Sequence, residues 1–336
     1  MIKIIDRLIN GENLTESQMS YAMEEIMDGR VEEVKIASFL TALRIKGETA
    51  EEISGGAKVM RDKAMKIDLR DRYTVDTCGT GGDGADTYNI STASAFVVAA
   101  GGVAVVKHGN RSVSSQSGSA DVLETLGVNI NMSSEKVKEC IEKINLGFLY
   151  APTFHNSMKY AAPVRKKLGF RTIFNLLGPL TNPAKASGQV LGVFHEKLTE
   201  LMAEAMKKLG TKHVLVVHGM DGMDEITVTN KTKISELKDG VINTYYVEPE
   251  DFGIKRSTEK ELRGGTPKEN AEIIKGIFKG EIKGAKKDIL LLNSGAALYV
   301  GKKVSSIKEG VEMAREIIES GKALVKLDEL IEMTNR

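Results

Sequence analysis

The pattern of the chain changes at Tyr73, and this change constrains the fold more than any other feature. Before it, apolar residues recur at helical spacing and no strand pattern appears. After it, short runs of β-branched residues alternate with helical patterns, which is typical of a largely parallel sheet covered by helices. We therefore predict an α/β protein. A small all-helical domain precedes a larger domain with a mostly parallel, mixed central sheet flanked by helices.

The domain boundary follows from the same change. We expect a helical domain over residues 1–70, joined by helices from about 156–185, and an α/β domain over residues 71–336. Two capping boxes, which begin at Thr15 and Thr49, indicate helix starts in the first domain. The candidate strands of the second domain are residues 74–77, 103–106, 148–150, 189–194, 213–217 and 225–228. Ligands of such sheets normally lie beyond the carboxyl ends of the strands.

Composition excludes several classes of protein. The chain has 47 basic and 46 acidic residues, whereas a generic nucleic-acid binder needs a basic excess, although a local basic patch stays open. Cys78 and Cys140 offer neither a disulfide framework nor the spacing of metal ligands. No apolar run approaches the length that spans a bilayer. We expect a cytoplasmic protein without a membrane partner.

A glycine-rich segment follows the first candidate strand. The stretch from Asp76 to Gly84 holds four glycines in six residues, so its backbone can approach a ligand and its N–H groups can surround an anion. It is neither a Walker loop nor a dinucleotide fingerprint. A tight turn that serves packing alone is the alternative. Ser91 and Thr92 should then lie at a helix N-terminus, where either phosphate binding or plain capping would suit them.

A second donor-rich segment follows the next candidate strand. Lys107 and Arg111 supply two cations, and a helix should begin at about Ser119. Cations neutralise phosphate charge while hydroxyls and amides orient it, so two such loops in succession favour phosphate binding over a mobile polar surface loop. Asp224 and Glu225 near these loops suggest Mg²⁺. On an extended strand they would point to opposite faces, so they share one ion through a local bend or serve two ions. Alone, the segment would be a solvated acidic turn.

Together these segments resemble the anthranilate phosphoribosyltransferase family, in the family's order and over essentially the whole chain. The motifs that carry the resemblance are Cys78-Gly-Thr-Gly-Gly-Asp83, Asn89-Ile-Ser-Thr92, Lys107-His-Gly-Asn-Arg-Ser-Val-Ser-Ser115, Gly118-Ser-Ala-Asp-Val-Leu-Glu124, Pro163-Val-Arg-Lys-Lys-Leu-Gly169, Arg171-Thr-Ile-Phe-Asn-Leu-Leu-Gly-Pro-Leu-Thr-Asn-Pro183 and Asp221-Gly-Met-Asp-Glu225. The resemblance implies transfer of a phosphoribosyl group from phosphoribosyl pyrophosphate (PRPP) to anthranilate in tryptophan biosynthesis. It also implies Mg²⁺ as cofactor, generally as two ions, and a homodimer.

The resemblance assigns a role to individual residues. It implies PRPP contacts at Gly79, Gly82, Asp83, Thr87, Asn89, Ile90, Ser91, Thr92, Lys107, His108, Gly109, Asn110, Arg111, Ser112, Val113, Ser114, Ser115 and Ser119. It implies anthranilate contacts at Gly79, Asn110 and Arg165 and Mg²⁺ ligands at Ser91, Asp224 and Glu225. His108, His155 and Pro179 would line the channel of the aromatic substrate.

The expected chemistry needs no obligatory catalytic base, because an arylamine is already neutral near pH 7. Preorganised charge and positioning would supply the rate, and His108 and His155 are the candidates for acid–base assistance. Two other hypotheses stay open. A pyrimidine nucleoside phosphorylase shares the helical-plus-α/β plan but should carry a phosphate loop of different wording. A non-catalytic nucleic-acid-binding relative should have a basic surface and lack Asp224 and Glu225.

Overall fold

The computed structural model describes residues 1–70, 72–112 and 116–336. Within these residues a seven-stranded sheet has the order β3-β2-β1-β4-β5-β6-β7. Neighbours from β3 to β5 are parallel, and β6 and β7 are antiparallel. The mostly parallel, mixed sheet predicted from the sequence is thus confirmed. The strands are β1 (Thr74–Asp76), β2 (Ala104–Gly109), β3 (Leu146–Tyr150), β4 (Gly188–Gly192), β5 (His213–Gly219), β6 (Thr232–Lys238) and β7 (Val241–Val247).

Two hydrophobic cores lie on opposite faces of the sheet. Leu215 and Val217 of β5 belong to the larger core, whereas Val214 and Val216 belong to the second. Successive residues of a strand point to opposite faces, so this alternation separates the cores. The larger core takes in α5 (Ile90–Ala100), α6 (Ser119–Leu126), α7 (Ser134–Ile144), α8 (Ala151–Phe154), α12 (Glu259–Leu262), α13 (Pro267–Phe278), α14 (Ala285–Val300), α15 (Ile307–Glu319), α16 (Lys322–Asn335) and the 3₁₀ helix η3 (Pro249–Phe252).

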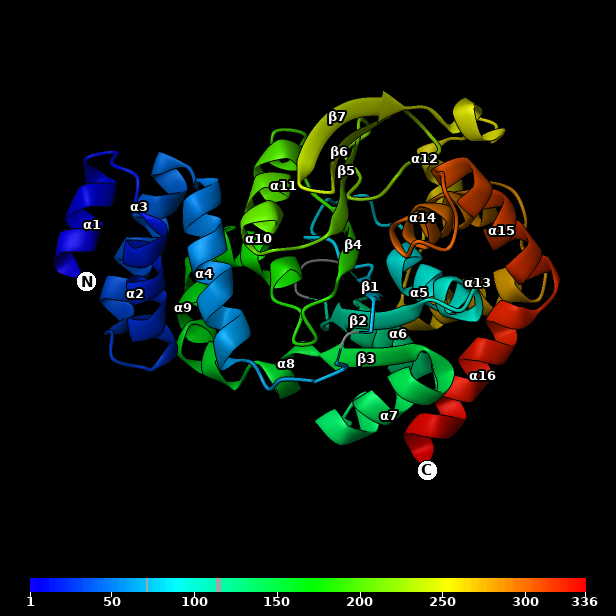
Figure 1. Ribbon diagram of the computed structural model, residues 1–336, viewed down its shortest axis with the longest axis horizontal. Helices are drawn as coiled ribbons and strands as arrows, with labels where there is room; N and C mark the ends of the chain where they lie inside the picture. Colours follow the sequence, from blue (N-terminus) through cyan, green and yellow to red (C-terminus); the bar gives the residue numbers. More distant parts are fainter. Residues whose placement is uncertain (71, 113–115) are drawn as a thin grey trace.

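The second core joins the N-terminal helices to one face of the sheet. It takes in α1 (Ile2–Ile9), α2 (Glu16–Met27), α3 (Glu33–Lys46), α4 (Ala50–Lys63), α9 (Ala162–Leu168), α10 (Ile173–Leu177), α11 (Leu198–Lys208) and the 3₁₀ helix η2 (Gly178–Leu180). A further 3₁₀ helix, η1 (Asn156–Tyr160), follows α8. Helices α1–α4 lie at one end of the molecule and α16 at the other (Figure 1). Segments far apart in the sequence therefore share one core.

The N-terminal helices begin where the sequence predicted. Thr15 accepts a hydrogen bond from the amide of Gln18, and the Gln18 side chain accepts one from the amide of Thr15. Thr49 and Glu52 make the same reciprocal pair at the start of α4. Each capping box satisfies two amides that a helix start leaves unpaired. Among the described residues, no helix has both the length and the apolar character needed to cross a membrane.

One predicted strand was wrong, and two strands were missed. Residues 225–228 are rich in β-branched side chains, but Asp221 accepts hydrogen bonds from the hydroxyls of Thr227 and Thr229, which bends this stretch out of the sheet. The strand that pairs with β5 is β6, and its partner is β7. The polar residues of β6 and β7 interrupt the apolar runs by which the other strands were predicted. β7 in particular is an edge strand with several exposed positions.

Candidate functional site

The parallel strands bring three segments to one edge of the sheet. The glycine loop (residues 77–84) follows β1, the serine loop (residues 109–119) follows β2, and the acidic segment (residues 221–226) follows β5. The amide of Gly81 donates to Asp224 Oδ2 at 2.7 Å, which joins the glycine loop to the acidic segment. Lys107 Nζ at the end of β2 donates to the carbonyl of Thr77 at 2.7 Å, and Asn89 Nδ2 donates to the carbonyl of Ser117 in the serine loop at 3.0 Å. The structure therefore gathers the segments that the sequence analysis singled out.

Close packing explains why glycine occupies two of these positions. A Cβ on Gly79 would lie 2.6 Å from Asp224 Oδ2, and one on Gly192 would lie 1.5 Å from the carbonyl oxygen of Asp224. The amide of Thr80 donates to the carbonyl of Gly192 at 2.9 Å, which ties the glycine loop to the end of β4. Asp83 turns back toward the acidic segment, where its Oδ2 accepts from the amide of Asp224 at 3.3 Å. The loop thus lies directly against the acidic segment.

Helix α5 directs its N-terminus into the same region. Asn89 is its N-cap, but the Asn89 side chain makes no capping bond and instead contacts Ser117 and Asn270. Asn89 therefore does not cap the first-turn amides with its side chain, and the backbone of Ser91 hydrogen-bonds Glu225 instead. A helix N-terminus of this kind favours an anion. Thr87 forms an antiparallel bridge with Arg263, while Ile90 is buried.

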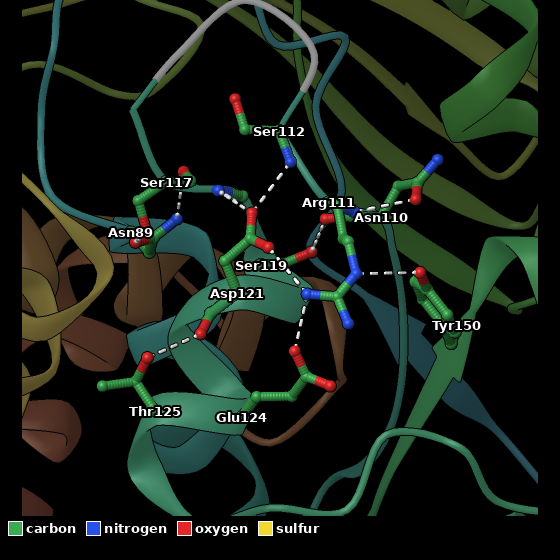
Figure 2. Close-up of polar contacts among 11 residues, drawn as sticks. Asn89, Asn110, Arg111, Ser112, Ser117, Ser119, Asp121, Glu124, Thr125 and Tyr150 are labelled. Atoms are coloured by element: carbon green, nitrogen blue, oxygen red, sulfur yellow. Dashed lines mark hydrogen bonds and ion pairs between the residues drawn. The ribbon is translucent and has the colours of Figure 1, made fainter.

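The serine loop is held by Asp121 of α6. Its Oδ2 accepts from the amides of Ser112 and Gly118, both at 2.9 Å, and its Oδ1 accepts from Arg111 at 3.0 Å (Figure 2). Although partial burial opposes ionisation, these two amides and Arg111 lower the pKa of Asp121. One carboxylate therefore joins both limbs of the loop. Val113, Ser114 and Ser115 lie outside the described residues.

The other predicted residues of the serine loop have distinct surroundings. Arg111 also pairs with Glu124 at 2.6 Å, so its guanidinium faces α6 (Figure 2). Asn110 is exposed, and its carbonyl accepts from Ser119 Oγ at 3.2 Å. A Cβ on Gly109 would lie 2.1 Å from Ser119 Oγ. Lys107 is buried beneath the loop, with 3% of its surface exposed.

Carboxylates crowd the acidic segment. Burial and the neighbouring charge of Asp83 raise the pKa of Asp224 to about 7. Burial and the charge of Asp224 hold the pKa of Glu225 well above its usual range, while Lys107 and the backbone of Ser91 oppose that shift. Both residues lie in a bend, as one of the two sequence hypotheses required. Ionised carboxylates this close favour a bound cation, which would offset their repulsion.

A small cavity separates the acidic segment from α5. Its lining brings together the three predicted metal ligands and is made of Thr77, Gly79, Ser91, Ser94, Val190, Gly192, Asp224, Glu225 and Asn293. Hydroxyl and carboxylate oxygens are the ligands that Mg²⁺ prefers, so the donor set fits this ion. Asp76, Cys78 and His108 also offer ligand atoms within 4.8 Å of one another. There, however, Asp76 already accepts from Asn182 and from the amide of His108.

Two buried histidines lie beside this region. The rings of His108 and His155 are 5.2 Å apart between centroids. Burial, with the neighbouring His155 and Lys107, holds the pKa of His108 well below its usual range, and burial lowers the pKa of His155 to about 4. Both imidazoles are therefore neutral near pH 7. Pro179, the third predicted channel residue, accepts a hydrogen bond from Gln189 at its carbonyl.

Arg165 is a half-buried cation that no acidic side chain pairs within the part of the chain described. Its guanidinium lies over the ring of Phe174 at 5.1 Å, and burial lowers the pKa of Arg165. The segment after α9 meets the glycine loop, because Arg171 donates to the carbonyl of Gly82 and stacks on Phe194. An unpaired, partly desolvated guanidinium is suited to a carboxylate.

Several polar residues at the site escaped the sequence analysis. Asn182 bridges Asp76 Oδ2 and the carbonyl of Val106, both at 2.7 Å. Asn270 donates to Asn89, and Asn293 bonds the backbone of Ile226. For Asn293 the available signal was a polar residue inside an apolar helix, in Leu291-Leu-Asn293-Ser. Buried polar groups of this kind are normally paired, so each required a partner.

The chain is similar to known proteins over almost its whole length. Residues 2–64 match the helical bundle domain of the glycosyl transferase family, and residues 71–324 match its a/b domain. The anthranilate phosphoribosyltransferase of Acetivibrio thermocellus is 62% identical over 333 residues, which cover 99% of this chain and 96% of that protein.

Solved structures show the same likeness. The anthranilate phosphoribosyltransferase of Thermus thermophilus is 44% identical with a TM-score of 0.94, and the match covers 99% of each chain. The enzyme of Saccharomyces cerevisiae in complex with PRPP and Mg is 30% identical with a TM-score of 0.90, over 99% of this chain and 97% of that one. This chain belongs to the anthranilate phosphoribosyltransferase family.

Proposed function

We propose that the chain transfers the 5-phosphoribosyl group of PRPP to anthranilate, giving N-(5-phosphoribosyl)anthranilate and pyrophosphate in tryptophan biosynthesis. The observation that carries the proposal is the meeting of the glycine loop, the serine loop and the acidic segment at one sheet edge. A further group that supports the proposal is Arg165 of α9, whose guanidinium lies over Phe174 and has no acidic partner among the described residues. These are the groups that a polyphosphate, a divalent cation and an aromatic carboxylate require.

PRPP would lie against the glycine loop, the N-terminus of α5 and the serine loop. The backbone amides there and Lys107 would neutralise its phosphates. Arg111 pairs with Asp121 and Glu124 in this structure, so its guanidinium would serve PRPP only after releasing them. The proposed contacts are Gly79, Gly82, Asp83, Thr87, Asn89 to Thr92, Lys107 to Ser112 and Ser119.

The residues that would hold Mg²⁺ are Ser91, Asp224 and Glu225, and we propose two ions. When bound with PRPP, Mg²⁺ would neutralise the negative charge that develops on the pyrophosphate leaving group. The ionised carboxylates would otherwise repel one another across the cavity. A bound cation would therefore offset the repulsion between the carboxylates of the acidic segment.

Anthranilate would be held by its carboxylate on Arg165 and oriented by Asn110 and Gly79. Its nitrogen is neutral near pH 7 and attacks C1 of the ribose as the bond from C1 to the pyrophosphate oxygen breaks. A neutral His108 or His155 would then be able to accept the proton that the nitrogen loses. We expect inversion at C1 without a covalent enzyme intermediate, and a product with retained configuration would contradict this.

We further propose that the chain works as a homodimer in the cytoplasm, with small-molecule substrates and no nucleic acid or membrane. The balance of 47 basic and 46 acidic residues supports the exclusion of nucleic acid. The two alternatives are disfavoured by the acidic segment, which a non-catalytic nucleic-acid-binding relative should lack, and by family membership. Nucleoside phosphorolysis would be the next assay if transfer failed.

The test is the loss of anthranilate fluorescence in a mixture of protein, PRPP and Mg²⁺. Arg165→Ala should raise the KM for anthranilate roughly 10- to 100-fold, because a charge-assisted pair contributes about 1.5–3 kcal/mol. The KM for PRPP should change little. Lys166→Ala is the matched control, since Lys166 is an exposed cation of the same helix. Folded wild-type protein that leaves the fluorescence unchanged would refute the proposed function.

A further inference from the structure

One polar side chain inside an apolar helix contacts the acidic segment from behind. Asn293 lies on α14, where the residue is only 3% exposed and belongs, with Glu225, to the lining of the cavity. Its Oδ1 accepts from the amide of Ile226 at 2.9 Å. Its Nδ2 donates to the carbonyls of Ile226 and Ile289, also at 2.9 Å each. All three hydrogen bonds of the Asn293 side chain therefore join it to backbone groups.

These bonds replace the partner that a sheet would provide. Residues 225–228 have left the sheet, so the N–H and C=O of Ile226 need another donor and acceptor. Asn293 supplies both from one amide group, much as a neighbouring strand would. Its third bond, to Ile289 four residues earlier, orients the amide on the helix. The backbone after Glu225 is therefore fixed to a buried helix rather than to another loop.

The two carboxylates are thereby held from two sides. Asp224 is held by the amide of Gly81 and by the close approach of its backbone to Gly192. Glu225 follows directly, and the bonds of Asn293 fix the backbone of the residue next to it. A shift at Ile226 would rotate Glu225 away from Ser91 and out of the cavity lining.

We propose that Asn293 is a positioning residue that fixes the bend of the acidic segment, so that Asp224 and Glu225 face the same cavity and hold the metal–PRPP complex. The inference rests on the proposed function of the acidic segment. Alanine lacks both hydrogen-bonding groups, and aspartate would set a carboxylate against the carbonyl of Ile226. Neither residue can therefore reproduce the arrangement.

The matched control is Tyr299→Phe. Tyr299 lies on the same helix as Asn293, and its hydroxyl donates to Glu236 of β6 at 2.8 Å. Its loss weakens the contact of α14 with β6 without touching Ile226. A general loosening of the helix should therefore affect both variants, whereas a defect of the acidic segment should affect only the changes at Asn293.

Three measurements test the role. The first is amide exchange at residues 221–229, where Asn293→Ala should speed the exchange of Ile226 at least about tenfold. The second is Mn²⁺ binding with PRPP and without anthranilate, followed by electron paramagnetic resonance, where the affinity should fall about tenfold. The third is kinetic: excess Mg²⁺ should restore kcat, and the KM for anthranilate should not change. Tyr299→Phe should match wild type in all three.

The outcomes separate this role from a merely structural one. Wild-type Mn²⁺ affinity in Asn293→Ala, with a lowered melting temperature alone, would overturn the proposal. If that variant does not fold, Asn293→Ser, which keeps one donor and acceptor, replaces it in the same assays. Wild-type protein that binds no Mn²⁺ with PRPP and consumes no anthranilate would instead refute the proposed function, and the exchange measurement would still report on the backbone contact.

Discussion

At the residue scale, the ionisation of Asp224 links the site to stability. Its pKa is about 7 in the folded protein against a usual 3.8, because burial and Asp83 disfavour the charged form. Between these values the unfolded chain has lost the proton that the folded protein retains, so rising pH stabilises the unfolded state. The stability of the ligand-free protein should therefore fall as pH rises from about 4 to about 7.

Urea denaturation across this range measures the effect. Asp224→Asn should be more stable than wild type near pH 8, and its stability should depend less on pH. Mg²⁺ with PRPP should stabilise wild type more near pH 8 than near pH 5, because only ionised carboxylates bind the cation. If the stability of wild type and of Asp224→Asn depended equally on pH, the pKa of Asp224 would not be raised in the folded protein, and the prediction would fail.

A second prediction concerns Asp121, which joins Ser112 to Gly118 through one oxygen (Figure 2). Asp121→Asn keeps the volume but removes the charge and replaces an acceptor with a donor. The KM for PRPP should rise about tenfold, because the loss of charged hydrogen bonds loosens the serine loop. Glu124→Gln is the control. Glu124 also pairs with Arg111, but the amides of Ser112 and Gly118 donate to Asp121. Steady-state kinetics should separate the two variants.

The sequence predicts the role of some site residues and not of others. Residues in contiguous motifs, such as those around Gly79 or Lys107, could be predicted because a loop after a strand carries its chemistry in adjacent letters. Asn270 and Asn293 lie outside these motifs, and Asn182 lies inside one but received no role, because each acts on a group many positions away. The same limit applies to Arg165, whose lack of an acidic partner among the described residues is visible only once the chain is folded.

At the element scale, the start of α4 depends on a buried acid. Glu52 is fully buried, and its oxygens accept from the amides of Leu14 and Thr49 at 2.8 Å each and from Lys46 at 2.9 Å. The carboxylate thus caps α4 and fixes the loop before α2. Glu52→Ala would leave the buried ammonium of Lys46 without this carboxylate.

Breaking a buried ion pair from one side destabilises a protein by about 3–5 kcal/mol. We expect a loss of this order for Glu52→Ala in chemical denaturation monitored by circular dichroism. Glu51→Ala is the matched control, because Glu51 is an exposed neighbour in the same first turn. Similar stabilities of the two variants would mean that the buried pair contributes no more than a surface residue.

The predicted elements differ in how local their signals are. The capping boxes of α2 and α4 are complete within four residues, so they could be read directly. The stretch at 225–228 had the β-branched composition of a strand, but Asp221 captures the hydroxyls of Thr227 and Thr229. The β6–β7 hairpin does carry a local signal. That signal is the dipeptide Asp239-Gly240, which is typical of a two-residue hairpin turn, and both residues have the positive φ that such a turn requires.

At the scale of the whole molecule, exposed large apolar side chains are enriched in the first helices. Among the described residues, Ile2, Ile9, Tyr21, Val34 and Ile45 make up five of the eleven exposed large hydrophobic residues, although they fall within the first 45 positions. This end lies away from α16 (Figure 1). Concentrated apolar exposure of this kind marks a contact surface, which supports the proposed homodimer.

Val34 and Ile45 are the residues on which the dimer should depend. They are eleven positions apart in α3, which is close to three helical turns, so their side chains share one face. Both are largely exposed, at 68% and 82% of their surface, and neither belongs to either core. Glutamate at both positions would place charges in the proposed interface without disturbing the packing of α3 against the other helices.

The double variant Val34→Glu with Ile45→Glu should therefore run as a monomer in light scattering coupled to gel filtration, at concentrations where wild type is a dimer. Its KM for PRPP should stay within about twofold, because α3 carries no residue of the glycine loop, the serine loop or the acidic segment. Val325→Glu is the control, since Val325 is comparably exposed on α16 at the opposite end. If the double variant were still a dimer, the interface would not include Val34 and Ile45. A monomeric wild type would refute the proposed homodimer.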